Sequence, residues 1–92
     1  MSSARAPAGH FSILYFASAS SYTKKQQEHL QAPLSVSALF DELDRRYPGI
    51  KEKVLRSSAL TVNLDYVDVD DAAGSVINEG DEVAIIPPVS SG

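Results

Sequence analysis

The alternation of apolar and polar residues changes period several times along the chain, and each period predicts a different element. Residues 10–16 are apolar at nearly every position, so both faces of a strand there carry apolar side chains. Residues 83–86 form a second apolar run, unbroken and largely β-branched, which predicts a strand buried on both faces. We therefore expect these two runs to form the centre of a sheet.

Residues 33–47 carry a helical period. Apolar side chains recur there every three or four residues and form one stripe: Val36, Leu39, Phe40, Leu43 and Tyr47. Ser35 or Ser37 can cap the N-terminus, because a serine hydroxyl accepts a hydrogen bond from the first turn of a helix. Pro48 and Gly49 follow the last periodic residue and end the helix. The stripe predicts one amphipathic helix that packs on a sheet.

The shorter segments around this helix are less regular. Residues 17–23 are small and polar, which predicts a loop, and the charged residues 24–30 predict an edge strand. Residues 50–58 can hold another short turn, and their lysines and arginine indicate a solvated connector. Residues 60–69 alternate, which predicts a hairpin with its turn near Leu64 and the aspartate that follows.

Together these elements predict an α+β fold. Because one long helix covers only one face, we expect a single mixed sheet with that helix packed across it. If the first and last strands lie side by side and parallel, the helix is a right-handed crossover between them, and the arrangement is a β-grasp. The domain is expected to span residues 10–88, between a flexible N-terminal arm at 1–9 and a flexible C-terminal tail at 89–92.

Composition narrows the possible functions. The net charge of −4 and the pI of about 4.9 argue against a nucleic-acid partner. The chain has no cysteine, which excludes disulfides, thiol catalysis and thiolate metal sites and favours a cytosolic location. No apolar run approaches the length of a membrane span.

The C-terminal residues form a thin extension of the last strand. Pro87 lacks a backbone donor and Pro88 holds it extended, so sheet pairing should stop there. The six residues after Ile86 could reach about 20 Å. Val89, Ser90, Ser91 and Gly92 have little side-chain bulk and end in a carboxylate. Such a segment is either ordinary fraying of a terminus or a peptide that threads a narrow channel in another protein.

Other candidate chemistry finds little support. Asp68 and Glu79 have the spacing of the first and twelfth ligands of a calcium loop, but alanines occupy the middle, so no metal site is expected. His10 and His29 are isolated and are interpreted as strand-edge surface residues. No phosphate-binding loop is present, so any ATP would be bound by a partner. Five aromatic residues are assigned to the core: Phe11, Tyr15, Phe16, Phe40 and Tyr47. Strand residues near Val62 or Ile85 could instead line an exposed apolar docking face.

Residues 80–92 consist of Gly-Asp-Glu, an apolar run, Pro-Pro-Val and Ser-Ser-Gly. This C-terminus resembles that of the small, sulfur-carrier subunit of molybdopterin synthase, a family that typically ends in Gly-Asp-Glu, an apolar run and Pro-Pro-Val-Ser-Gly-Gly. Residues 14–17, 45–49 and 62–67 match the family in the same order. The chain departs from the family at Ser91, where the family has glycine. Glycine at this position adopts φ > 0 freely and allows close approach of another backbone, and serine does neither as readily.

The resemblance implies a ubiquitin-like β-grasp protein whose terminal glycine, here Gly92, is the working group. In the family, a ubiquitin-activating-type adenylyltransferase uses ATP to adenylate this carboxylate, and sulfur transfer converts it to a thiocarboxylate. The tail then enters the large subunit of the synthase, where the sulfur is donated to cyclic pyranopterin monophosphate to form the dithiolene. The tail residues that enter the partner's channel map to Pro87, Pro88, Val89, Ser90 and Ser91. The chain itself is implied to be non-catalytic and to bind no cofactor.

Two other functions remain open at this point. The chain could be a β-grasp sulfur carrier for thiamine synthesis or for transfer RNA thiolation. It could also be a protein modifier that is joined to lysines through Gly92. The identity of the partner distinguishes these functions: a synthase large subunit, a thiazole synthase or a ladder of conjugates.

Overall fold

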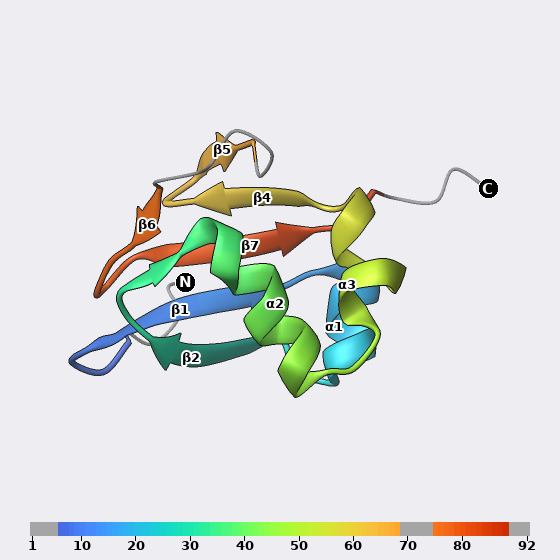
Figure 1. Cartoon of the computed structure of the whole chain (residues 1–92), viewed down its shortest axis with the longest axis horizontal. Helices are drawn as coiled ribbons and strands as arrows, with labels where there is room; N and C mark the ends of the chain where they lie inside the picture. The colour runs from blue at the N-terminus through green and yellow to red at the C-terminus, as the bar shows by residue number, and fades with distance from the viewer. Residues whose placement is uncertain (1–5, 69–74, 89–92) are drawn as a thin grey trace.

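A computed structural model describes residues 6–68 and 75–88, so the predicted tail from Val89 to Gly92 and the first five residues of the predicted arm lie outside the described residues. The fold is built on a five-stranded mixed sheet (Figure 1). Its order is β2 (Gln27–Gln31), β1 (His10–Tyr15), β7 (Glu82–Ile86), β4 (Ala59–Val62) and β5 (Asp65–Val67). β1 and β7 pair in parallel, and the other neighbours are antiparallel. The predicted parallel pairing of the first and last strands is confirmed.

The helices lie between the strands in sequence. They are α1 (Ala17–Thr23), α2 (Val36–Arg46), α3 (Ile50–Lys53) and the 3-10 helix η1 (Leu55–Ser57). Two short strands, β3 (Leu34–Ser35) and β6 (Val76–Ile77), pair antiparallel beside the main sheet. α2 packs across one face of the sheet (Figure 1). The predicted β-grasp fold is confirmed.

α2 forms where the sequence predicts it. The Ser35 hydroxyl accepts a hydrogen bond from the Ala38 N–H at 3.1 Å and caps the N-terminus, while Leu39 and Leu43 are completely buried against the sheet. The chain leaves the helix through Gly49 at φ +93°, where an added Cβ would lie 2.6 Å from the Tyr22 hydroxyl oxygen. Glycine is favoured at this helix end because its φ is positive, and a larger residue would also displace the Tyr22 hydroxyl.

The core is one-sided, which corrects the expectation that both faces of the central strands are covered. Val83 and Ile85 are completely buried on the α2 side, and Ala84 is buried on the other face because it is small and lies between neighbouring strands. Ile86 is only half-buried, and Phe16 is 47% exposed, so its assignment to the core was wrong. One face of the sheet is left uncovered because, in the described part of the chain, the long helix α2 packs on the other face only.

Two segments that were interpreted as polar connectors contain buried helices. Residues 17–23 form α1 and not a loop, because Ala19 is buried against the core and the Thr23 hydroxyl donates to the Ala19 carbonyl at 3.0 Å. The short turn expected within residues 50–58 is present as α3 and η1, but the segment is not simply a solvated connector. Ile50, Val54 and Leu55 point into the core. In both segments, a few apolar positions outweigh a polar composition.

The hairpin of β4 and β5 turns one residue earlier than predicted. Val62 pairs with Asp65, so Asn63 and Leu64 are the two turn residues. Both have positive φ, 51° and 74°, as a primed two-residue hairpin turn requires. Asparagine tolerates this left-handed conformation, whereas for an ordinary residue such as Leu64 it costs roughly 1–2 kcal/mol.

Leu43 provides a test of the packing between α2 and the sheet. We expect Leu43→Ala to lower the free energy of unfolding by about 2–5 kcal/mol, because the leucine is completely buried and leaves a cavity. The control is Asp41→Ala in the same helix, which removes only a surface ion pair with Lys51 and should cost about 1 kcal/mol or less. Urea denaturation followed by circular dichroism measures both. Equal, small losses would show that α2 is not packed as described.

Candidate functional site

The base of the C-terminal tail lies at the end of a central strand. The last sheet pair is Ala59 with Ile86, and the chain leaves the ladder at Pro87, as predicted. Pro87 is buried and Pro88 is exposed, so the chain passes from the body of the protein to its surface within two residues. Val89, Ser90, Ser91 and Gly92, the remaining predicted site residues, lie outside the described residues.

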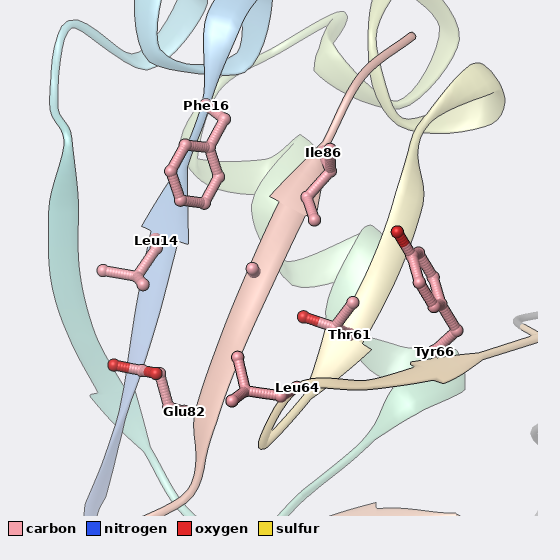
Figure 2. A pocket seen from close by; sticks show the side chains of 8 residues that line it. Leu14, Phe16, Thr61, Leu64, Tyr66, Glu82 and Ile86 are labelled. Carbon is pink, nitrogen blue, oxygen red and sulfur yellow. The ribbon is translucent and has the colours of Figure 1, made fainter.

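The face of the sheet opposite α2 carries exposed apolar side chains beside this exit point. These side chains line a shallow pocket of about 250 Å³. They come from β1, from Phe16 directly after it, from β7 and from the β4–β5 hairpin (Figure 2). We call this surface the open face; its lining residues are Leu14, Phe16, Thr61, Leu64, Tyr66, Glu82, Ala84 and Ile86. Leu64 is 85% exposed and Tyr66 76% exposed, which is unusual for side chains of this size.

The open face follows from strand geometry. Because side chains alternate along a strand, the residues of β1 that face α2 leave Leu14 and Phe16 on the other side. Leu14 pairs with Ala84, which also pairs with Thr61, and Thr61 pairs with Tyr66, so these residues form one row across four strands. The sequence interpretation missed Phe16 and Tyr66, although one helix covering one face would have predicted an uncovered apolar row. Of the strand residues near Val62 and Ile85 that were considered for a docking face, Thr61, Ala84 and Ile86 do line the open face. Ile85 itself is completely buried, and Val62 packs against the core.

The turn at the far end of the open face is tied to the start of β7. The Asn63 side-chain oxygen accepts from the Glu82 N–H at 3.0 Å, and its side-chain nitrogen donates to an Asp81 carboxylate oxygen at 3.1 Å. The Asn63 N–H also donates to the Glu82 carbonyl at 2.7 Å. The other Asp81 oxygen accepts from the Asn78 N–H at 2.8 Å. These contacts fix the position of the hairpin turn relative to β7.

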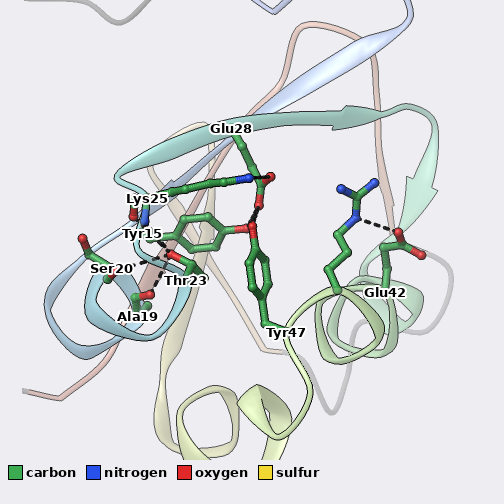
Figure 3. Close-up of polar contacts among 9 residues, drawn as sticks. Tyr15, Ala19, Ser20, Thr23, Lys25, Glu28, Glu42 and Tyr47 are labelled. Carbon is green, nitrogen blue, oxygen red and sulfur yellow. Dashed lines mark hydrogen bonds and ion pairs between the residues drawn. The ribbon is translucent and has the colours of Figure 1, made fainter.

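A polar cluster lies on the other side of the sheet, between β2 and the end of α2 (Figure 3). The Tyr15 and Tyr47 hydroxyls both donate to one Glu28 oxygen, the second at 2.7 Å, and the Lys25 ammonium donates to the other at 3.2 Å. Burial alone would raise the pKa of Glu28, but these three hydrogen bonds outweigh it and hold the pKa below its usual range. Burial, together with the hydrogen bond to Glu28, raises the pKa of Tyr15.

This cluster is structural in character. The rings of Tyr15 and Tyr47 meet edge to face at 6.3 Å, and the carboxylate joins the edge strand β2 to the residue that follows α2. The hydrogen-bond donors to the Glu28 carboxylate are the side chains of Tyr15, Tyr47 and Lys25, all members of the same cluster. The cluster stabilises the sheet edge.

The remaining candidates from the sequence do not assemble into a site. His10 lies on the internal strand β1, where its ring Nδ1 is 3.0 Å from the Ala8 carbonyl oxygen, and not at a sheet edge; His29 is half-buried on the edge strand β2. Within residues 6–68 and 75–88, no group of three His, Cys, Asp or Glu side chains is placed to hold a metal ion. In the same residues, no helix is long and apolar enough to cross a bilayer.

A mixed β-grasp sheet with one open apolar face and a central strand that leads to the C-terminus defines a ubiquitin-like β-grasp protein. The ThiS family model matches residues 13–92, and the chain belongs to this family. A relative from Pyrenophora tritici-repentis is named molybdopterin synthase sulfur carrier subunit; it is 61% identical over 93 residues, which cover both chains completely. The assignment made from the C-terminal residues is confirmed.

Solved structures show the same fold at lower identity. The small archaeal modifier protein 1 from Methanosarcina acetivorans has a TM-score of 0.73 and 18% identity, over 98% of this chain and all of that chain. A chain in the complex of subunits 1 and 2 of the molybdopterin-converting factor from Helicobacter pylori has a TM-score of 0.62 and 20% identity, over 90% of this chain and 99% of that chain. At these low sequence identities, the structural similarity is evidence for the fold and for nothing further.

Glu28 provides a pH-dependent test of the polar cluster. Because its pKa is lowered in the folded protein, Glu28 stabilises the fold above the usual glutamate pKa of about 4.3. This contribution is lost as the pH falls through the lower, folded-state pKa. We expect Glu28→Gln to reduce the free energy of unfolding by about 1–3 kcal/mol at pH 7, because two hydroxyls lose a charged acceptor. The difference from wild type should shrink towards pH 3.

Denaturation curves between pH 7 and pH 3 measure this difference. The matched control is Glu52→Gln, which removes an exposed ion pair with Arg56 and should change stability little. A difference between wild type and Glu28→Gln that stays constant down to pH 3 would contradict the lowered pKa.

Proposed function

We propose that this protein is the sulfur carrier subunit of a molybdopterin synthase and that its Gly92 carboxylate carries the sulfur. The observation that supports this most directly is the position of β7. This central strand is paired on both sides and leaves the sheet at Pro87, beside an apolar face. The sequence that follows consists of small residues and ends in Gly92. The name of the relative at 61% identity points to the same role.

The proposed chemistry uses the chain as a substrate of two partners. A carboxylate is a poor acylating agent, so it must first be activated. A carboxylate oxygen attacks the α-phosphorus of ATP in the activating adenylyltransferase, pyrophosphate leaves, and an acyl-adenylate forms. Hydrosulfide from the sulfur donor then attacks the acyl carbonyl carbon and displaces AMP, which leaves a thiocarboxylate on Gly92. In the large subunit, this sulfur is transferred to cyclic pyranopterin monophosphate.

The chain supplies a carrier and not an active site. The sequence contains no phosphate-binding loop and no cysteine, so ATP and the sulfur donor are assigned to the activating enzyme. Residues 87–91 are proposed to pass through a channel that admits only a slim peptide. We expect the chain to bind no cofactor and to act in the cytosol.

The open face is the proposed docking surface for the large subunit. Phe16 and Ile86 lie at the end of the face where the chain leaves the sheet, so a partner that receives the tail must cover this region (Figure 2). Contiguous exposed apolar side chains are typical of protein–protein interfaces. The Helicobacter pylori protein with this fold was solved in a complex of its subunits 1 and 2, which is consistent with such a partner.

The position of Gly92 tests the carrier function. Deleting Gly92, or adding one residue after it, should leave the fold intact but abolish sulfur loading, because the carboxyl group shifts by about one residue, roughly 3.3 Å. Each protein is incubated with the activating enzyme, ATP and a sulfur donor, and its intact mass is measured. Wild type should exchange one oxygen for sulfur within the C-terminal peptide.

Ser91→Gly is the matched control for this experiment. It restores the family's usual ending without changing the length, so we expect loading at least as fast as in wild type. Loading of the extended variant at the wild-type rate, or a label elsewhere in the chain, contradicts the proposal. A ladder of lysine conjugates, or sulfur delivery to a thiazole synthase, would instead identify one of the alternative functions.

Tyr66 tests the docking surface. Because its side chain is 76% exposed, Tyr66→Ala should change the free energy of unfolding by less than about 0.5 kcal/mol. Tyrosines in protein–protein interfaces are often hot spots, so we expect the Kd for the large subunit to rise by about tenfold or more. Isothermal titration calorimetry measures this, with Val76→Ala, an exposed apolar residue outside the open face, as the control. An unchanged Kd for Tyr66→Ala would show that the partner binds elsewhere.

A further inference from the structure

Leu64 combines two features that are unfavourable in the isolated protein. It is the most exposed large apolar side chain in the described part of the chain, at 85%. It also has φ +74°, in the left-handed region that favours glycine or asparagine. A glycine at the second position of this turn would avoid both costs. Strain of this kind persists where the surroundings enforce it, and it is often connected with function.

The surroundings of Leu64 do enforce it. The preceding residue, Asn63, is bound to the start of β7 through its backbone N–H and through both ends of its side-chain amide. The turn therefore cannot rotate away from the sheet without breaking three hydrogen bonds. Figure 2 shows the Leu64 side chain at the edge of the pocket, close to β7 and Glu82, at the end opposite Phe16 and Ile86.

We infer that Leu64 is a pre-positioned anchor residue that inserts into an apolar pocket of the synthase large subunit. This inference rests on the proposed function and adds a specific contact to it. Leu64 lines the same pocket as Phe16 and Ile86, and the chain beyond the described residues begins three residues after Ile86. A partner that holds the tail therefore lies over the same face.

The position of the anchor indicates its effect. The tail leaves β7 at one end, and Leu64 lies beside the other end of the same strand. Contacts at both ends fix the direction of β7 on the partner, and this direction aims the tail at the partner's active site. Because the turn is already held in place, binding costs little ordering of the backbone. Leu64 is thus a positioning residue and takes no part in the sulfur chemistry.

Three substitutions separate the side chain from the turn. Leu64→Gly removes the side chain and relieves the backbone strain. Leu64→Asn keeps a side chain that tolerates positive φ but makes it polar. Leu64→Met keeps an apolar side chain of similar size. Val76→Asn is the control, because it makes the same apolar-to-polar change at an exposed position outside the open face.

The measurements are the Kd for the purified large subunit, by titration calorimetry, and the midpoint of urea unfolding. For Leu64→Gly and Leu64→Asn, we expect the Kd to rise about tenfold or more and the unfolding midpoint to stay equal or increase. Leu64→Met and Val76→Asn should bind like wild type.

Three other outcomes would contradict either the inference about Leu64 or the proposed function. If Leu64→Gly and Leu64→Asn bind like wild type while Tyr66→Ala binds weakly, the inference fails and the proposed function stands. If both Leu64 variants lose binding together with a lowered unfolding midpoint, Leu64 is a structural residue of the turn and the inference also fails. If the wild type itself does not bind the large subunit, the proposed function fails with it.

Discussion

The parallel pairing of β1 with β7 is the constraint on which the rest of the structure depends. Parallel neighbours cannot be joined by a tight turn, so all the chain between them must cross from one end of the sheet to the other. The long helix α2 lies within that connection and covers one face of the sheet. The same pairing puts the last strand inside the sheet, with β1 on one side and β4 on the other. The C-terminus is therefore attached to a firmly held strand.

One-sided coverage follows from the same topology. In the described residues the one long helix packs on a single face, so the other face of β1 and β7 stays open to solvent. Polar side chains there would suit an isolated protein, yet Phe16, Tyr66 and Leu64 are large, apolar and exposed. Because this face adjoins the point where the chain leaves β7, the surface and the tail can serve a single partner at the same time. This proximity is what makes a carrier function plausible on physical grounds.

The sequence predicted the elements that have a local, periodic pattern of apolar residues. It did not predict the elements whose structure is determined by contacts with distant parts of the chain. The stripe of α2 and the apolar runs of the central strands are visible in a few neighbouring residues. The helix α1 is not, because its serines favour a loop and only the burial of Ala19 against the sheet selects the helix. The left-handed turn at Leu64 depends on hydrogen bonds between Asn63 and residues near Asp81, far along the chain. Phe16 belongs to a clear apolar run, but the hydrophobicity of a residue alone does not show whether a helix covers the sheet face on which it lies.

The register of β7 couples the two parts of the proposed site. Alternate residues of this strand face the core and the open surface, so a shift of one residue would turn Ile85 outward and Ile86 inward. The same shift would move the terminal carboxylate by roughly 3.3 Å along the tail. The first change would alter the proposed docking surface. The second would displace the carboxylate from the position at which a partner can act on it. The hydrogen bond from the Ser12 N–H to the Asp81 carbonyl and the hydrogen bonds of Asn63 hold this register, so they support both parts of the proposed site.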